Sequence, residues 1–397
     1  MNLSVERIGE VVTIRYEGML DSVSAPIVHQ ELQTQLASQG DIDELVWNAS
    51  ELTYLSSSGL RVLLGLKKQY PCFHIVEVGM EVFDILDLTG FTQIIPTERK
   101  LREVSIDGCE LVGKGGVGTV YRLSDDTIIK VFRKDATMDM LNTEMNLAKE
   151  SFLLGMPTAI TFDVVRVGDQ LGLVYELLKA KTLSDCIKQH PERLDEYAIL
   201  YAKLFKQLHS IEVQKGSIIG DSYEQEINQL EYIRRYFDDE SVDLLIHIVQ
   251  SVPKGNRLLH GDLQTKNVML QDGELMMIDM GEVGYGHPLL DLAHSYSSLV
   301  SLVGDYDAII GFPRKYGEPF WNTMMSVYFE GESAETIAHR NEQIRVASLV
   351  RNFSWLSLSD SFPSEVIKEC QEVFEERVKN HKEYIYKMCE TFSDWQL

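Results

Sequence analysis

Four short segments of the chain carry residue types that together can transfer a phosphoryl group, and they follow one another in a fixed order. The first is rich in glycine, at Gly113, Gly115 and Gly118, and the second is Lys130 within an apolar run. The third pairs an aspartate with an asparagine five residues later, and the fourth contains another aspartate. These are the groups that transfer from Mg-ATP requires. Each segment is common alone, but the ordered set predicts a phosphotransferase that uses ATP and Mg²⁺.

The glycine loop predicts a turn whose backbone amides approach phosphate groups closely. A Cβ at Gly113, Gly115 or Gly118 would obstruct that approach, and Val120 takes the last place of G-x-G-x-x-G-x-V. The loop is followed by the strand-like residues 119–122 rather than by a helix, which disfavours a dinucleotide-binding fold. Taken alone, the loop fits a glycine-rich hairpin turn equally well.

Lys130 lies in the apolar run 128–131, nine residues after Tyr121. An exposed strand lysine is the simpler interpretation, but the loop upstream favours a lysine held over the α- and β-phosphates. Such a lysine needs a carboxylate from the following helix. Glu144 is the first choice for that carboxylate and Glu150 the second.

Residues 260–267 read His-Gly-Asp-Leu-Gln-Thr-Lys-Asn and form the most specific segment. Asp262 is predicted to accept a hydrogen bond from the attacking hydroxyl, and Asn267 to bind Mg²⁺. His260 is predicted to brace this loop. Asp279 follows an apolar run and is predicted to chelate the metal ions that bridge the phosphates. The alternative for either aspartate is a turn residue after a strand.

These motifs resemble the protein-kinase-like superfamily, on its aminoglycoside phosphotransferase and choline kinase side. Gly261 replaces the arginine usual in protein kinases, and Gln264 stands where serine/threonine kinases carry a lysine. Asp291 follows Asp279 after only twelve residues, and residues 286–293 resemble the G-x-P-x-x-D-L-A element of small-molecule phosphotransferases. That spacing leaves no room for a long activation segment.

The resemblance also implies roles for residues outside the four segments. Asp291 is expected to brace the catalytic loop, with an ordinary helix cap as the alternative. Residues 173–178 resemble the interlobe hinge, where the backbone groups of Glu176 and Leu178 would hold adenine. Lys266 is either a cation near the γ-phosphate or a solvated loop lysine.

The order of elements in this part of the chain is typical of a two-lobed α+β kinase-like domain. Strand-like runs continue to about residue 178, and long amphipathic stretches follow, such as 192–211 and 364–390. We therefore expect an N-lobe at residues 104–180 and a helical C-lobe at residues 181–397.

Residues 1–98 are predicted to form a separate α/β domain with a mixed sheet. Short strands and helices alternate there at βαβ spacing. The polar stretch 96–103 lacks apolar periodicity and is predicted to be the domain boundary. The pattern predicts strands at 11–16, 44–47 and 73–78, and helices at 25–36, 60–66 and 82–88.

This first domain resembles the STAS domain of anti-sigma-factor antagonists. The matching residues are 18–21, 45–47, 54–60 and 88–91. The resemblance implies a phosphorylation site at Ser58, just before a Gly-Leu pair at the start of a helix. A phosphate there is favoured by the helix dipole and changes the charge of a docking face. This chain has Ser56 where the family often has Asp, and capping of the helix by residues 56–58 is the competing interpretation.

The bulk composition limits the partners and the compartment. Of 397 residues, 37 are Lys or Arg and 61 are Asp or Glu, so the formal charge is -24. This charge disfavours nucleic acid and anionic lipid, and it either attracts a cationic substrate or simply maintains solubility. Five scattered cysteines without C-x-x-C spacing indicate reduced thiols. No apolar run approaches the roughly 18–20 residues of a membrane span, so we expect a cytoplasmic protein.

Two functions follow from the sequence. The first is phosphoryl transfer from ATP to a hydroxyl of a small molecule, for which a cation is one candidate, with the STAS domain in docking or regulation. The second is a signalling kinase that phosphorylates a STAS serine, either Ser58 of its own chain or a serine of a STAS or anti-sigma-type partner. Covalent fusion favours the second by raising the effective concentration of Ser58.

Overall fold

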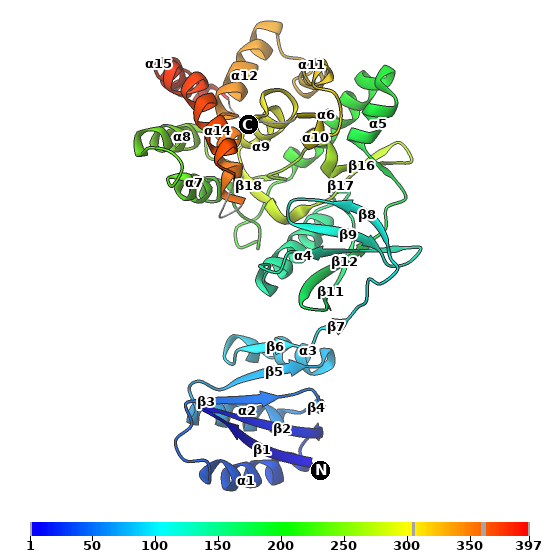
Figure 1. Ribbon diagram of the computed structural model, residues 1–397, viewed down its shortest axis with the longest axis vertical. Helices are drawn as coiled ribbons and strands as arrows, with labels where there is room; N and C mark the ends of the chain where they lie inside the picture. The colour runs from blue at the N-terminus through cyan, green and yellow to red at the C-terminus, as the bar shows by residue number, and fades with distance from the viewer. Residues whose placement is uncertain (1, 304–305, 359–362, 396–397) are drawn as a thin grey trace. The chain divides into compact units, whose positions relative to one another are not determined.

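The computed structural model describes residues 2–303, 306–358 and 363–395 of the chain. The chain forms two compact units, Met1–Val104 and Ser105–Leu397 (Figure 1). Each unit contains its own cluster of buried hydrophobic side chains. Two separate cores are what two independently folding domains require.

The first unit is built on a mixed β-sheet. Strands β1 and β2 pair antiparallel, whereas the other neighbours pair in parallel. The order across the sheet is β1-β2-β3-β5-β6, and β4 also pairs with β2. The strands are β1 (Asn2–Ile8), β2 (Val11–Leu20), β3 (Glu44–Asn48), β4 (Leu52–Leu55), β5 (His74–Val78) and β6 (Thr97–Arg99).

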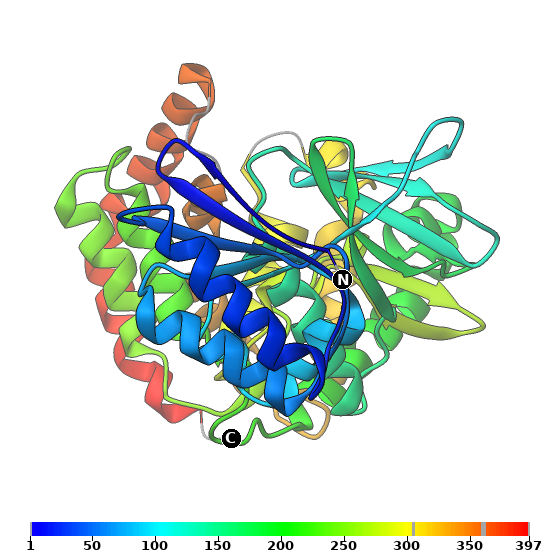
Figure 2. The same ribbon diagram turned by 90° about the horizontal axis from the view of Figure 1, so that it is seen from below.

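Helices cover this sheet and bury its apolar side chains. Helices α1 and α2 lie side by side against the strands (Figure 2). Ile14 and Trp47 from the sheet and Leu63 from α2 are among the buried core residues. The helices are α1 (Ser24–Ala37), α2 (Ser57–Gln69) and α3 (Met80–Leu88), followed by the 3₁₀ turn Phe91–Gln93. The mixed α/β fold predicted for this part of the chain is confirmed.

The polar stretch that the sequence predicts as a linker contains a strand. β6 begins inside it, because the Ile75 amide donates to the Pro96 carbonyl at 2.9 Å and the Lys100 amide donates to the Val78 carbonyl at 2.8 Å. Pairing at a sheet edge uses backbone groups and needs no apolar side chains. For the same reason the polar edge strand β1 escapes a prediction based on hydrophobic alternation.

The second unit begins with an antiparallel sheet, in which β11, β12, β10, β9 and β8 lie in that order. Helix α4 (Met138–Leu153) packs against β11 and β12. Thr137 caps this helix by accepting a hydrogen bond from the Met140 amide. The strands are β8 (Glu110–Lys114), β9 (Gly118–Arg122), β10 (Thr127–Phe132), β11 (Thr161–Val167) and β12 (Gln170–Glu176).

A helical lobe follows, and its helices enclose two small sheets, β13-β16-β17 and β14-β18-β15. A sheet followed by a helical lobe is the two-lobed kinase-like arrangement that the sequence predicts, and it is confirmed. The helices are α5 (Leu183–Gln189), α6 (Leu194–Ser210), α7 (Ser222–Ile233), α8 (Asp239–Ser251), α9 (Pro288–Tyr296), α10 (Tyr306–Ile310), α11 (Gly317–Tyr328), α12 (Ala334–Ala347), α13 (Arg351–Ser354), α14 (Ser364–Arg377) and α15 (Lys382–Glu390). The short strands are β13 (Lys181–Thr182), β14 (Gly220–Asp221), β15 (Arg257–Leu259), β16 (Val268–Gln271), β17 (Glu274–Met277) and β18 (Gly284–Gly286).

The predicted helix 364–390 is interrupted in the structure. It divides into α14 and α15, which are separated by a 3₁₀ turn, Lys379–His381. Val378 is fully buried at the break, so the change of direction carries an apolar side chain into the core. Apolar spacing does not reveal such a bend, because both helices keep an apolar face. Helix α15 then packs beside α8 (Figures 1 and 2).

Candidate functional site

Lys130 on β10 forms a double ion pair. Its Nζ lies 3.0 Å from Glu144 Oε1 on α4 and 2.8 Å from Asp279 Oδ1, which follows β17. The Lys130 side chain is only 12% exposed. Burial lowers the pKa of Lys130, but Asp279 and Glu144 outweigh this effect and hold the pKa above its usual value. The ammonium group therefore stays charged between two carboxylates.

The carboxylate of Glu144 is itself fixed from a second side. The hydroxyl of Tyr175 on β12 donates to Glu144 Oε1. Burial, and then the charge of Glu144, raise the pKa of Tyr175 well above its usual value, so the phenol remains a donor. The structure thus brings together Lys130 and Glu144, the first choice of the sequence. Within the described ranges, Glu150 makes no ion pair with Lys130.

Asp279 holds an uncommon backbone conformation. Its φ and ψ are 62° and 63°, in the left-handed region that few residues other than glycine adopt. Aspartate tolerates this region better than most residues. Such conformations persist where the surrounding structure imposes them, and they cluster at functional sites. Here the conformation follows directly after the end of β17 and places the carboxylate against Lys130.

Asp262 is held by donors on both carboxylate oxygens. Arg351 Nη2 donates to Oδ1 at 3.0 Å. Gln264 Nε2 and Asn267 Nδ2 donate to Oδ2 at 3.1 and 2.9 Å. Asn267 Nδ2 also reaches the Asp262 carbonyl at 2.9 Å. Gln264 and Asn267 thus bind back to Asp262 within the same segment, and the Asp262 side chain is 22% exposed.

Arg351 is the residue at this site that the motifs do not reveal. It lies on α13 and donates from Nη1 to Glu282 Oε2 at 3.0 Å, in addition to its bond with Asp262. Burial lowers the pKa of Arg351, but Glu282 and then Asp262 raise it, so the net shift is upward. Burial conversely raises the pKa of Glu282 against the opposing effect of Arg351. A guanidinium group from outside the four segments thus joins Asp262 to the turn after Asp279.

The loop before Asp262 is braced by Asp291 on α9. Asp291 Oδ2 accepts from the His260 amide at 3.0 Å, and Oδ1 accepts from the Gly261 amide at 2.9 Å. His209 Nε2 lies 3.2 Å from Oδ2. Burial raises the pKa of Asp291, but His209 and the other donors lower it further, so it remains ionised. The brace interpretation is confirmed, because the cap of α9 is His287 rather than Asp291.

The remaining groups of the loop explain two sequence features. His260 is fully buried, and its Nε2 lies 3.2 Å from the Ile278 carbonyl, which confirms a bracing role. Gly261 has a φ of +79°, and a Cβ there would lie 2.2 Å from the Glu282 carbonyl oxygen. Only glycine fits at that point. The absence of the protein-kinase arginine at Gly261 is therefore enforced by the backbone.

A buried ion pair between His294 and Glu226 supports the Asp262 loop. His294 on α9 contacts the Gly261 carbonyl through Nδ1 and lies 2.6 Å from Glu226 Oε1 of α7 through Nε2. Burial lowers the pKa of His294, but Glu226 raises it by more. Burial raises the pKa of Glu226, but His294 lowers it by more. An imidazolium that donates from both nitrogens therefore ties α7 to the catalytic-loop backbone.

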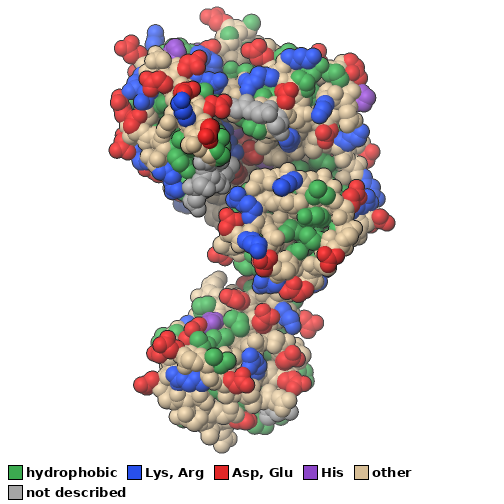
Figure 3. Space-filling model, viewed as in Figure 1, with side chains coloured by type: hydrophobic (Ala, Val, Ile, Leu, Met, Phe, Trp, Pro, Cys, Tyr) green, Lys and Arg blue, Asp and Glu red, His purple; other side chains and the backbone are tan. Residues whose placement is uncertain are grey.

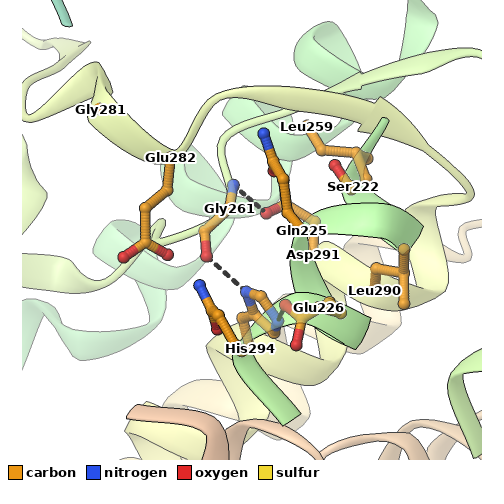
Figure 4. A pocket seen from close by; sticks show the side chains of 11 residues that line it. Ser222, Gln225, Glu226, Leu259, Gly261, Gly281, Glu282, Leu290, Asp291 and His294 are labelled. Atoms are coloured by element: carbon orange, nitrogen blue, oxygen red, sulfur yellow. Dashed lines mark hydrogen bonds and ion pairs between the residues drawn. The ribbon is translucent and has the colours of Figure 1, made fainter. Parts of the chain in front are cut away.

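A cavity of about 210 Å³ opens beside this ion pair (Figure 4). Gly261, Glu282 and the α9 residues form one side, and α7 forms the other. Three side-chain oxygens of α7 are buried and have no hydrogen-bond partner among the described residues: Ser222 Oγ, Glu226 Oε2 and Gln229 Oε1. The cavity therefore offers hydrogen-bond acceptors next to the Asp262 loop.

The glycine segment forms the hairpin between β8 and β9. The Gly115 amide donates to the Gly118 carbonyl at 2.9 Å. A Cβ on Gly118 would lie 2.5 Å from the Val131 carbonyl oxygen, whereas Gly113 faces open space and Gly115 meets no tight contact. Gly118 is thus required by strand packing, and the first two glycines leave the turn open for a ligand. Val120 pairs with Lys130 across β9 and β10.

The predicted hinge offers fewer free groups than the sequence suggests. The Glu176 amide donates to the Ile160 carbonyl at 2.9 Å, and the Glu176 carboxylate accepts from the Ile160 amide at 3.2 Å. Glu176 therefore has no amide left for a nucleotide. Leu178 is buried just after β12. Neither residue makes a hydrogen bond with the Lys130 cluster within the described chain.

Asn267 and Asp279 suit a magnesium ion. The Ile278 amide donates to the Asn267 carbonyl at 2.9 Å, which brings the two segments together at the ends of β16 and β17. Asn267 uses Nδ2 as a donor, so its Oδ1 faces away from Asp262. Carboxylate and amide oxygens are the ligands that Mg²⁺ prefers, with phosphates and waters completing the shell. No closed cluster of three or more His, Cys, Asp or Glu ligands occurs among the described residues.

Ser58 lies in the other unit, as the second residue of α2. The cap of this helix is Ser56, whose Oγ accepts from the Ser58 and Gly59 amides at 3.2 and 3.4 Å. Ser58 is half-buried, and no described residue hydrogen-bonds its hydroxyl. The structure thus separates the two interpretations of the serine run, since Ser56 makes the cap and leaves the Ser58 hydroxyl unused.

The surface and the helices add two observations on partners. On the face drawn in Figure 3, Lys and Arg side chains are interspersed with Asp and Glu rather than gathered into a basic patch. A basic stripe is the usual electrostatic footprint of a nucleic-acid-binding protein. In the described ranges, none of the helices combines the length and the apolar character that a membrane span needs.

Comparison with known proteins finds a similar curated protein and several solved structures of low sequence identity. BtrV of Bordetella bronchiseptica, whose name describes it as an anti-sigma factor antagonist, is 29% identical over 102 residues, which are 24% of this chain and 84% of that protein. A choline/ethanolamine kinase family protein from Mesorhizobium loti is 14% identical, with a TM-score of 0.49 over 72% of this chain and 92% of that chain. The GDP complex of a mutant of aminoglycoside 2'-phosphotransferase-IIIa is 18% identical, with a TM-score of 0.47 over 76% of this chain and 98% of that chain.

Two family models match the chain. The model described as the STAS domain matches residues 2–104. The model described as the phosphotransferase enzyme family matches residues 109–319, which is more than half of the chain. This match contains the glycine segment, Lys130, the Asp262 loop and Asp279. The chain therefore belongs to the phosphotransferase enzyme family and carries a STAS domain at its N-terminus.

Proposed function

We propose that this chain transfers the γ-phosphoryl group of ATP to a hydroxyl of a small molecule, and that its STAS domain docks or regulates this activity. The observation that carries the proposal is the Lys130 cluster. Lys130 contacts Glu144 and Asp279 at once, and Asp279 is joined through Ile278 to Asn267 of the Asp262 loop. An ATP site needs these parts within one cleft.

In this proposal the nucleotide is held by the N-lobe and by the turn after β17. The backbone of the hairpin at Gly113, Gly115 and Gly118 approaches the phosphates, and Lys130 pairs with them. Asn267 Oδ1 and the Asp279 carboxylate would hold Mg²⁺, whose charge would offset that of the phosphates. The carbonyl of Glu176 and the backbone of Leu178 remain as contacts for the base, with Val120 above it.

Asp262 orients the acceptor hydroxyl and receives its proton. Arg351 donates to Oδ1, and the Gln264 and Asn267 amides donate to Oδ2. These three donors leave one of the roughly four acceptor positions of the carboxylate for the hydroxyl. A fixed carboxylate saves the entropy of orienting the reacting groups. Arg351 is a positioning residue in this scheme because it acts through Asp262.

The cavity beside α7 supports an acceptor that bears amino groups. Glu226 Oε2, Gln229 Oε1 and Ser222 Oγ are buried acceptors without donors among the described residues. Burial of such groups is unfavourable until a donor arrives, and an ammonium group supplies three. The acidic residues Glu282 and Asp291 line the same cavity. The acceptor we propose is therefore an amino alcohol, which combines the hydroxyl with an ammonium group.

The experiment that tests the proposal compares the wild type with Asp262→Asn. ATP binding is measured by calorimetry with Mg²⁺, and turnover is measured with a panel of amines and amino alcohols. We expect nearly unchanged ATP binding and a loss of turnover by orders of magnitude in the variant. Failure of the wild type to bind ATP, or equal turnover in Asp262→Asn, would reject this function.

A second candidate is a signalling kinase that phosphorylates a STAS serine. The observation that favours it is the unused hydroxyl of Ser58 beside the Ser56 cap, in a domain whose relative is named as an anti-sigma factor antagonist. The partner would then be Ser58 of the same chain or a STAS or anti-sigma-type protein. Five free cysteines agree with the reducing cytoplasm as the compartment for either function.

Intact mass after incubation with Mg-ATP separates the two candidates. A gain of one phosphate that both Ser58→Ala and Asp262→Asn abolish would establish the signalling function. ATP binding without a mass gain, together with turnover of an amino alcohol, would establish the small-molecule function.

A further inference from the structure

A second cavity lies in the helical lobe, apart from the groups assigned above. Its volume is about 370 Å³, within the range of about 300–1,000 Å³ found for small-molecule pockets. It lies between the end of α9, the helices α12 and α13, and the pair α14 and α15. The site residues Asp262, Lys130 and Asp279 do not line it.

The polar groups around this cavity are mainly donors. Arg345 and Arg377 are the two guanidinium groups of its lining, His381 is a third basic side chain, and Glu376 is the single acidic one. Arg345 donates from Nε and Nη2 to Glu342 at 3.1 and 2.7 Å. Its Nη1 has no hydrogen-bond partner among the described contacts. The lining therefore combines positive charge with free N–H groups.

Arg377 is the least satisfied of these groups. Its Nη1 donates to the Ser301 carbonyl at 2.5 Å, but no carboxylate pairs with it among the described residues. Burial lowers the pKa of Arg377, although a guanidinium remains charged under all ordinary conditions. Glu376 attracts this charge and raises the pKa of Arg377, but it forms no direct ion pair with it among the described residues, so the half-buried guanidinium still lacks an anion in direct contact.

Asn352 provides a second, independent indication that the cavity suits an anion. It is 2% exposed, and its Oδ1 accepts from Ser297 Oγ at 2.7 Å and from Ser301 Oγ at 3.0 Å. These bonds fix the amide so that Nδ2 is left over, and Nδ2 has no partner among the described residues. Asn352 lines the cavity, so a buried donor without an acceptor borders the empty space.

The two serines that orient Asn352 belong to a π-helical turn, Ser297–Ser301, which continues α9. Turns of this type are rare and occur frequently at functional sites. The wider turn lets both serine hydroxyls reach one amide oxygen. The cavity wall is thus continuous with α9, which braces the Asp262 loop, and Asn352 directly follows Arg351 in the chain.

We propose that this cavity binds a small anion, a phosphate or carboxylate group of a metabolite, through Arg377, Arg345 and Asn352 Nδ2. An acceptor oxygen of the ligand would satisfy the unused Asn352 donor, and its charge would offset that of Arg377. A cationic ligand is disfavoured because it would leave both groups unsatisfied. This proposal does not depend on the phosphotransferase function, since it concerns a separate cavity.

The test is calorimetric titration of the full chain with inorganic phosphate and, separately, with succinate, at constant ionic strength. Phosphate also has an affinity for an ATP site, so Lys130→Met serves as the control that removes that site's cation. Arg377→Gln and Asn352→Asp are the variants of the cavity. Asn352→Asp is nearly isosteric, keeps one oxygen for the two serines, and replaces the free donor with a negative charge.

We expect one equivalent of succinate to bind to the wild type, and one equivalent of phosphate or succinate to bind to Lys130→Met, with affinity reduced by about tenfold or more in both cavity variants. Arg377→Lys, which keeps the charge, should retain part of the affinity. Thermal unfolding checks that the variants are folded. If Arg377→Gln does not fold, the proposal is tested with Asn352→Asp alone. Binding that survives Asn352→Asp, binding lost only in Lys130→Met, or no binding of either anion would overturn the proposal.

Discussion

Arg351 and Asp262 lie 89 residues apart in the sequence, and the guanidinium Nη2 meets the carboxylate Oδ1 at 3.0 Å. The second arm of the same guanidinium holds Glu282 at 3.0 Å. The Arg351 side chain is only 9% exposed. The planar fork of the arginine presents Nη1 and Nη2 to the two carboxylates in a fixed geometry, which the point charge of a lysine ammonium group does not provide. The helical lobe thus sets the position of the carboxylate in the Asp262 loop.

Replacement of Arg351 by methionine should destabilise the second unit. The change leaves Asp262 and Glu282 close together without their shared counter-ion, and loss of one partner of a buried ion pair costs about 3 kcal/mol. We expect Arg351→Lys to recover part of this loss, since it keeps the charge without the fork. Chemical denaturation of the full chain measures both effects.

Glu282→Gln is the matched control for this prediction. It removes one arm of the interaction but leaves Asp262 paired with Arg351, so we expect a smaller loss of about 1 kcal/mol. Equal stability of Arg351→Met and the wild type would show that the guanidinium does not hold the loop.

Lys130 is expected to contribute strongly to nucleotide binding. Its ammonium group is charged and fixed by Glu144 and Asp279. Loss of a charge-assisted contact to phosphate should weaken binding of a non-hydrolysable ATP analogue by about tenfold or more in Lys130→Met. Calorimetry with Mg²⁺ present measures the affinity.

Lys134 provides the control lysine in the same lobe. Its side chain is 72% exposed and pairs with Asp169 at the surface. Exposed ion pairs contribute little, so Lys134→Met should bind the analogue like the wild type. A similar loss in both variants would indicate a general effect of charge rather than a site at Lys130.

Local sequence patterns predicted the parts of the site that lie in regular elements. Lys130 and Glu144 sit on a strand and a helix whose periodicity is visible in the sequence. The sequence alone does not set the helix register, so it left Glu150 open as the second choice. The bracing roles of Asp291 and His260 followed from the motif around them. The geometry confirms these pairings.

Arg351 escaped prediction because its partners are distant in sequence and no motif surrounds it. One physical indication was available. Arg351 stands in the apolar stretch 344–356, where a charged residue is rarely buried unless it is paired. Ser222, Glu226 and Gln229 share one face of α7 at helical spacing, but the cavity that they line also requires the α9 residues, which lie far along the chain. The left-handed backbone of Asp279 likewise depends on tertiary contacts.

His287 should make stability depend on pH. Its Nδ1 caps α9 by accepting from the Leu289 amide at 3.1 Å, and its Nε2 lies 3.2 Å from the Trp395 carbonyl, to which it donates. This pattern requires the neutral ring. Burial lowers the pKa of His287 to about 4. Between its ordinary pKa of about 6.5 and this value, the unfolded chain binds a proton that the folded chain does not.

The free energy of unfolding should therefore fall as the pH drops from about 6.5 to 4, with up to about 3 kcal/mol assignable to His287. Urea denaturation of the wild type and His287→Asn across this range measures the difference, and the gap between the two should narrow as the pH falls. The exposed His190 serves as control, because its ion pair with Glu192 lies at the surface and contributes little, so His190→Asn should change stability only slightly. A constant gap between the wild type and His287→Asn would show that His287 does not titrate in this range.

Ser56 and Ser58 should differ sharply in their effect on the STAS domain. Ser56 accepts from two amides at the start of α2 and donates to the Leu20 carbonyl at 3.3 Å, so Ser56→Ala should cost about 1 kcal/mol. The Ser58 hydroxyl has no hydrogen bond among the described residues, so Ser58→Ala should change stability by less than about 0.5 kcal/mol. Scanning calorimetry of the full chain measures both, with the exposed Ser57→Ala as control. A Ser58→Ala loss as large as that of Ser56→Ala would make Ser58 a structural residue and remove the main reason for treating it as a phosphorylation site.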